Sequence, residues 1–76
     1  MTFIEHVELL RRMDHLIRRK ATGRYDDFAR RIGISVASLF RRLDELKMLG
    51  AEIQYCSRRQ SYFYNNAFSF WRAAPG

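Results

Sequence analysis

A three-residue break at positions 33–35 separates two segments of helical periodicity. Of all features of the sequence, this break constrains the possible folds most strongly. The segments on either side, residues 25–32 and 36–49, each place apolar side chains on one face at a spacing near 3.6 residues. Gly33 readily adopts the left-handed conformation that ends a helix, and Ser35 is a residue type that caps the next helix. The sequence therefore predicts two helices joined by a tight turn.

A longer amphipathic helix precedes this pair. Residues 3–21, beginning with Phe3, repeat apolar side chains at helical spacing over about half of the helix circumference, more than one packing partner needs. His6 lies in this apolar stripe, where a partly buried, hydrogen-bonded histidine is expected, and Asp14 lies at its edge. The width of the stripe predicts two packing neighbours for this helix.

The period of apolar residues changes from helical to two after residue 50, as strands require. Residues 51–55 and 61–65 predict a β-hairpin with Arg58 and Arg59 at its tip. The expected fold class is mainly α with a small β-hairpin (α+β), in which the second and third of three helices form a helix-turn-helix.

The 76 residues allow one domain, which is expected to span positions 1–65. Positions 66–76 form a tail that carries Phe68, Phe70 and Trp71. These aromatic side chains are expected to cover the wide apolar stripe of the first helix, either in the same chain or in a second copy. The surplus apolar surface predicts a homodimer through the first helix and this tail.

Positive charge is concentrated in one part of the sequence. The chain carries a net charge of +6, and the excess falls entirely between residues 18 and 42. The cationic residues there are Arg18, Arg19, Lys20, Arg24, Arg30, Arg31, Arg41 and Arg42, against Asp26 and Asp27. Such a concentration is typical of polyanion-binding surfaces, although a solvated basic surface is the alternative. For residues 18–24, a lateral phosphate clamp and a solvated helix end both remain open.

Several functional classes are excluded. The single cysteine, Cys56, allows no internal disulfide and suggests no zinc site, which favours a reducing cytoplasm. No long apolar run predicts a signal peptide or a membrane span. His6 and His15 lie on opposite sides of their helix and cannot share a metal, and no nucleophile, base and orienting group converge. We therefore expect no catalysis, no metal and no cofactor.

Cys56 is either redox-sensitive, because Arg58 and Arg59 favour its thiolate, or an inert exposed thiol.

Three stretches carry a resemblance to a known family: "DDFARRIGIS", "SLFRRLDELKMLGAEIQY" and "SYFY". With the order of three helices and a hairpin, they resemble the winged helix-turn-helix domains at the N-termini of DeoR-type and WYL-type bacterial transcription regulators. The resemblance covers roughly residues 7–64. It implies double-stranded DNA binding, with the third helix in the major groove and the hairpin, or wing, beside it.

The resemblance also implies roles for individual residues. Ser35 caps the recognition helix, Val36, Ala37 and Ser38 form its leading edge, and Phe40 and Arg41 lie on its exposed flank. Helical geometry independently directs Ala37, Arg41 and Asp44 away from a core of three leucines. Arg41 is expected to contact a guanine edge or a phosphate, with pairing to Asp44 or Glu45 as the alternative. Arg42 lies nearer the core, where a structural salt bridge is expected.

Four further arginines are candidates for DNA contact. Arg58 and Arg59 at the wing tip are expected on the DNA backbone or in a minor groove. Arg30 and Arg31 end the second helix, where they contact phosphates or complement the negative end of the helix dipole.

This chain departs from the family pattern at the recognition helix. Val36 and Ala37 stand where the relatives often carry Arg or Lys, and Phe40 replaces a usual tyrosine. These changes leave short apolar side chains that suit contact with a thymine methyl but offer few hydrogen bonds to bases. The expected function is a small bacterial transcription regulator, cytoplasmic and located on the nucleoid when bound. The alternatives are a protein-interaction module on the same scaffold and, third, RNA binding.

Overall fold

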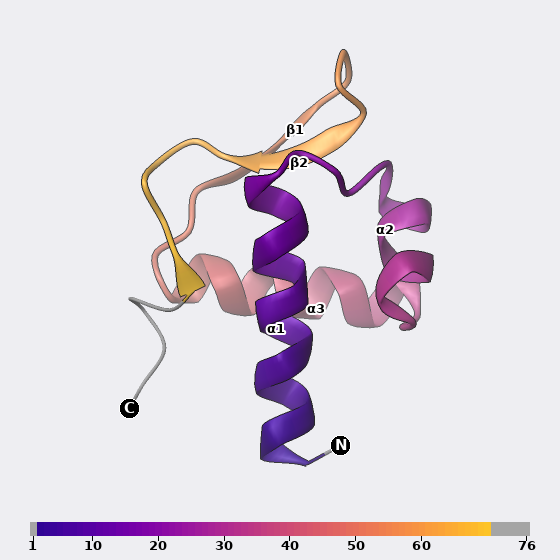
Figure 1. Cartoon of the computed structure of the whole chain (residues 1–76), viewed down its shortest axis with the longest axis vertical. Helices are drawn as coiled ribbons and strands as arrows, with labels where there is room; N and C mark the ends of the chain where they lie inside the picture. The colour runs from indigo at the N-terminus through magenta and orange to yellow at the C-terminus, as the bar shows by residue number, and fades with distance from the viewer. Residues whose placement is uncertain (1, 71–76) are drawn as a thin grey trace.

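The described residues, 2–70, form three helices and a two-stranded antiparallel hairpin in the computed structural model (Figure 1). In chain order the elements are α1 (Phe3–Arg18), α2 (Tyr25–Ile32), α3 (Val36–Met48), β1 (Ile53–Cys56) and β2 (Ser61–Tyr64). The fold class predicted from the sequence is confirmed. Helix α1 runs across the front of α3 in Figure 1, α2 lies beside the first turns of α3, and the hairpin lies at the C-terminal end of α1.

Helix α1 ends three residues earlier than its periodicity predicts, at Arg18 instead of residue 21. Lys20 adopts a left-handed conformation with φ 55°, which turns the chain out of the helix. At the other end, Phe3 was expected in the apolar stripe, yet 74% of it is exposed. The reason is visible in Figure 1, where the N-terminal turns of α1 extend beyond α3.

The three helices enclose one apolar core. Its fully buried large side chains are Met13 and Ile17 of α1, Phe28 of α2, and Leu39 and Leu46 of α3. From the tail, Phe70 joins this core and Phe68 packs against it, so both side chains pack within the same chain. Trp71 lies outside the described residues.

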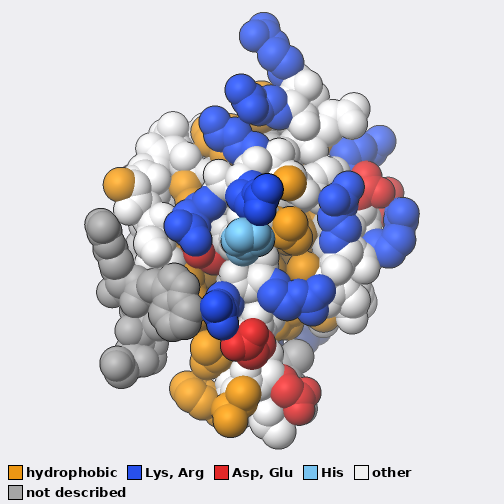
Figure 2. Space-filling view, in the orientation of Figure 1, with side chains coloured by type: hydrophobic (Ala, Val, Ile, Leu, Met, Phe, Trp, Pro, Cys, Tyr) orange, Lys and Arg blue, Asp and Glu red, His pale blue; other side chains and the backbone are white. Residues whose placement is uncertain are grey.

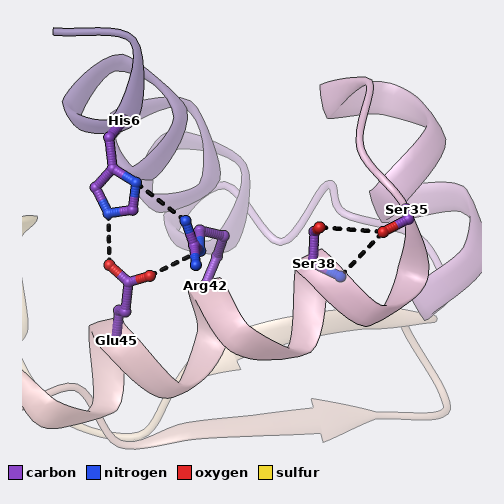
Figure 3. A network of polar contacts seen from close by, with 5 residues as sticks. All are labelled: His6, Ser35, Ser38, Arg42 and Glu45. Atoms are coloured by element: carbon purple, nitrogen blue, oxygen red, sulfur yellow. Dashed lines mark hydrogen bonds and ion pairs between the residues drawn. The ribbon is translucent and has the colours of Figure 1, made fainter. Parts of the chain in front are cut away.

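The turn between α2 and α3 forms as the sequence predicts. Gly33 ends α2 in the left-handed conformation, with φ 74°, and the N–H of Ile34 donates to the carbonyl of Ala29 at 3.0 Å. The Ser35 hydroxyl then accepts a hydrogen bond from the N–H of Ser38 at 3.1 Å (Figure 3). This N-cap satisfies one of the free N–H groups at the start of α3 and fixes where that helix begins.

Buried hydroxyl groups attach the hairpin to the connection between α1 and α2. Thr22 and Ser61 are both buried, and the N–H of Thr22 donates to Ser61 Oγ at 3.1 Å. In return, the N–H of Tyr62 donates to Thr22 Oγ1 at 2.9 Å. Because both partners are buried, these bonds set the position of β2 relative to the helices.

Candidate nucleic-acid interface

The outer side of α3 is the surface that the sequence predicts for DNA contact. Leu39, Leu43 and Leu46 are buried, and the intervening Ala37, Phe40, Arg41 and Asp44 are exposed. Of the other predicted contact residues, the cap Ser35 is exposed, and Val36 and Ser38 are half-buried. We call Ser35, Val36, Ala37, Ser38, Phe40 and Arg41 the α3 face.

Arg41 and Arg42 have different surroundings although they are neighbours. Within the described residues the Arg41 side chain forms no ion pair, with Asp44, Glu45 or any other carboxylate. Arg42 Nε instead lies 2.7 Å from Glu45 Oε1, which confirms the predicted structural salt bridge. Arg41 is therefore the arginine of α3 whose guanidinium is available to a ligand.

His6 completes a three-residue network with Arg42 and Glu45 that joins α1 to α3 (Figure 3). Arg42 Nη1 donates to His6 Nδ1 at 3.0 Å, and His6 Nε2 lies 2.5 Å from Glu45 Oε2. Since a guanidinium only donates, Nδ1 accepts, and the ring proton is assigned to Nε2, which donates to the carboxylate. The partly buried, hydrogen-bonded histidine expected from the sequence is confirmed.

Four aromatic side chains form two ring pairs on α2, α3 and the hairpin, and we call them the aromatic strip: Phe40, Tyr25, Tyr62 and Tyr55. The ring centroids of Tyr25 and Phe40 are 6.0 Å apart, and those of Tyr55 and Tyr62 are 5.1 Å apart. Burial raises the pKa of the Tyr62 hydroxyl, with further contributions from the neighbouring Tyr55 and Tyr25 hydroxyls. Phe40, Tyr25 and Tyr55 are each between 40% and 46% exposed, so the strip presents aromatic surface beside the α3 face.

Sequence periodicity does not reveal this strip. It draws one residue from each of α2 and α3 and two from the hairpin, so no single helical or strand pattern contains it. The only sequence signal is the register of the hairpin, which places Tyr55 directly opposite Tyr62.

The tip of the hairpin carries Arg58 and Arg59, both exposed and without ion pairs among residues 2–70. Next to them, the backbone N–H of Arg59 is the main cause that lowers the pKa of the Cys56 thiol. The backbone N–H of Arg58 and the charges of both arginines add to this effect, and partial burial opposes it. The sequence correctly linked Cys56 to these arginines, but the backbone contributes more than the side-chain charges.

The two arginines that end α2 lie apart from this tip. Arg30 Nη2 is 3.4 Å from Asp27 Oδ1 within the same helix, and both side chains are largely solvent-exposed. Arg31 is exposed beside α1, where its carbonyl accepts a hydrogen bond from Arg12 Nη2 at 3.2 Å. The structure thus brings Arg31 together with arginines of α1.

The eight cations between residues 18 and 42 differ in their surroundings. Three of them face carboxylates: Arg18 pairs with Asp14, Arg30 with Asp27 and Arg42 with Glu45. The remaining charged residues exposed on α3 are Arg41 and Lys47 against Asp44, a net charge of +1. Lys and Arg side chains gather instead over α1 and α2, on the side of the molecule shown in Figure 2.

Comparisons with protein-family models, with curated proteins and with solved structures give no match to this chain. Neither the length nor the hydropathy of any helix in residues 2–70 would allow it to cross a membrane. Within the same residues, no three His, Cys, Asp or Glu side chains are grouped closely enough to hold a metal ion.

Proposed function

We propose that this protein binds double-stranded DNA through the α3 face and acts as a small bacterial transcription regulator. The observation that carries the proposal is the exposed guanidinium of Arg41 on the outer side of a helix whose other side is buried in the core. The resemblance of the sequence to winged helix-turn-helix domains also supports the proposal. We further propose that the protein is cytoplasmic and lies on the nucleoid when bound to DNA.

The size of α3 suits a major groove. Thirteen residues give a rod about 20 Å long, and a groove about 12 Å wide admits one helix. The small side chain of Ala37 permits close approach, Phe40 can contact a thymine methyl, and Arg41 can bind a guanine or a phosphate. With so few hydrogen-bonding groups, the face favours binding of limited sequence specificity. Arg58 and Arg59 would contact the backbone or a minor groove.

The proposal includes a homodimer. A single helix reads few base pairs, whereas two copies read half-sites about 34 Å apart. At the N-terminal end of α1, Phe3 and Ile4 are 74% and 73% exposed, and this apolar surface is the part of α1 left for a second copy. Sedimentation that shows only a 9.1 kDa monomer at tens of micromolar would exclude the dimer.

Binding to a random-sequence duplex, followed by fluorescence anisotropy over a range of salt concentrations, tests the DNA proposal. We expect log K to fall with log[salt] at a slope of about −4 to −7, for five to eight phosphates neutralised. Arg41→Gln should weaken binding about tenfold without lowering the stability, since this guanidinium has no ion-pair partner within residues 2–70. A flat salt response, or wild-type affinity in Arg41→Gln, would contradict the proposal.

Arg42→Gln is the matched control, because it removes the same charge one residue away. This variant breaks the contacts with Glu45 and His6, so we expect a lower melting temperature and near-wild-type affinity where the protein is folded.

The aromatic strip supports a second candidate function, a protein-interaction module on the same scaffold. Phe40, Tyr25 and Tyr55 expose aromatic surface of the kind enriched in protein interfaces. Copurification of a partner that is lost in Phe40→Ala, together with no binding to any duplex at low salt, would favour this function over DNA binding. The third alternative, RNA binding, is tested by adding structured RNA as a competitor for the duplex in the anisotropy assay.

A further inference from the structure

A second basic surface lies on the outer side of α1. Arg11, Arg12, His15 and Arg19 recur at helical spacing and are all exposed, and Arg31 of α2 stands beside them. We call these five residues the α1 basic face. Figure 2 looks onto α1 from its exposed side and shows Lys and Arg side chains gathered over it.

Four residues of the α1 basic face line a shallow, open depression of about 430 Å³ between α1 and α2. Its lining residues are Glu8, Arg11, Arg12, His15, Leu16 and Arg31. Glu8 is the one carboxylate among them, 3.4 Å from Arg11 Nη1. The α1 basic face and Glu8 together carry four arginines against one glutamate, a net charge of +3.

One guanidinium at this depression is held in position by the fold. Arg12 Nη2 donates to the carbonyl of Arg31 at 3.2 Å, across the gap between the two helices. Since a guanidinium has five N–H donors, this bond leaves others available to a phosphate oxygen.

The α1 basic face and the α3 face point to different sides of the molecule. Helix α1 lies in front of α3 in Figure 1, and each helix buries its inner side in the shared core. The exposed side of α1 is therefore directed away from any duplex that lies against α3.

We propose that the α1 basic face binds the sugar-phosphate backbone of duplex DNA, separately from the α3 face. The inference extends the proposed function, because a protein that uses both faces holds two segments of DNA. Binding at the α1 basic face would be independent of sequence, since arginines on an open surface contact phosphates and reach no base edges.

A two-colour capture experiment tests this proposal. One duplex is immobilised, the protein is bound to it, and capture of a second, fluorescent duplex is measured beside the affinity for a single duplex. Arg12→Gln/Arg19→Gln should reduce capture of the second duplex about tenfold, because two phosphate contacts are removed. The affinity for the first duplex should stay within about twofold of the wild type.

Lys20→Gln/Lys47→Gln is the control, since it removes two charges outside the α1 basic face. Equal loss of capture in this control, or wild-type capture in Arg12→Gln/Arg19→Gln, would overturn the proposal. Circular dichroism shows whether each variant is folded. If Arg41→Gln binds a single duplex normally and Arg12→Gln/Arg19→Gln does not, the α1 basic face stands as a DNA-binding surface and the proposed role of the α3 face fails.

Discussion

The hydroxyl of Tyr64 donates a 2.7 Å hydrogen bond to the buried carboxylate of Asp14, which joins the end of β2 to the middle of α1. The same Asp14 Oδ1 accepts from the N–H of Phe70 at 3.3 Å, and Arg18 Nε lies 3.1 Å from Oδ2. Only 2% of the Asp14 side chain is exposed, so these partners replace the water that a carboxylate would otherwise bind. One carboxylate thus holds together α1, the hairpin and Phe70 of the tail.

Removal of the Tyr64 hydroxyl should therefore destabilise the fold. A hydrogen bond to a charged acceptor contributes about 1.5 to 3 kcal/mol, and we expect Tyr64→Phe to lower the free energy of unfolding by about this amount. Urea denaturation measures the change. Tyr62→Phe is the control, because the Tyr62 hydroxyl makes no hydrogen bond within residues 2–70. An equal loss in both variants would show that the contact with Asp14 is not the cause.

The same contact predicts a dependence on alkaline pH. Burial, and then the hydrogen bond to Asp14, raise the pKa of Tyr64 well above its ordinary value near 10. The unfolded chain therefore loses the phenolic proton at a pH where the folded protein keeps it. The stability from this group is complete below about pH 10 and declines as the pH rises further. Urea denaturation at several alkaline pH values should show a smaller decline in Tyr64→Phe than in the wild type.

Local patterns in the sequence were sufficient to predict the elements of this fold. The predicted end of α2 and start of α3 are those observed, because Gly33 and Ser35 each act within their own turn of chain. Asp14 shows what such local patterns cannot predict. Its place at the edge of an apolar stripe does not reveal that Tyr64, fifty residues later, covers it. Burial by a distant segment is a property of tertiary packing, which helical periodicity does not contain.

The candidate site was only partly predictable for the same reason. The periodicity of α3 correctly directs Arg41 outward and Arg42 toward the core, because both follow from one helix. Net charge along the sequence does not show that Arg18, Arg30 and Arg42 face carboxylates. It also does not place Arg31 beside Arg12, because their contact depends on how α2 packs against α1.

Two glycines with nearly the same positive φ should respond differently to alanine. Gly23 and Gly33 have φ values of 73° and 74°, so alanine at either position costs about 1 to 2 kcal/mol of backbone strain. A Cβ at position 23 would also lie 2.9 Å from the Cβ of Asp27, whereas a Cβ at position 33 meets no atom within 4 Å. Thermal denaturation should therefore show a larger loss for Gly23→Ala than for Gly33→Ala. Equal losses of stability in the two variants would mean that backbone strain alone, without the contact with Asp27, determines the effect of alanine.

The reactivity of Cys56 provides a test of the hairpin tip. Its lowered pKa increases the fraction of thiolate at neutral pH, and the thiolate is the form that reacts. The rate of alkylation by iodoacetamide should rise with pH about a midpoint below that of the urea-unfolded chain. Arg59→Ala keeps the backbone N–H that contributes most, so it should move the midpoint only slightly. A folded midpoint equal to the unfolded one would contradict the described tip geometry.

The paired hydroxyls of Thr22 and Ser61 should act as one unit. Thr22→Val keeps the shape of the side chain but leaves the partly buried N–H of Tyr62 without its acceptor, at a cost of about 1 to 3 kcal/mol. Ser61→Ala removes the acceptor for the N–H of Thr22 and should cost a similar amount.

Since the two hydroxyl oxygens are also 3.1 Å apart, the double variant should lose less stability than the sum of the single variants. Urea denaturation of all four proteins gives this coupling energy. Hydrogen exchange at the β1 and β2 amides should accelerate in each single variant, because the hairpin then opens without unfolding α1. Additive losses, with exchange unchanged in the hairpin, would show that packing of Tyr62 against Phe28 holds the hairpin in place without these hydroxyls.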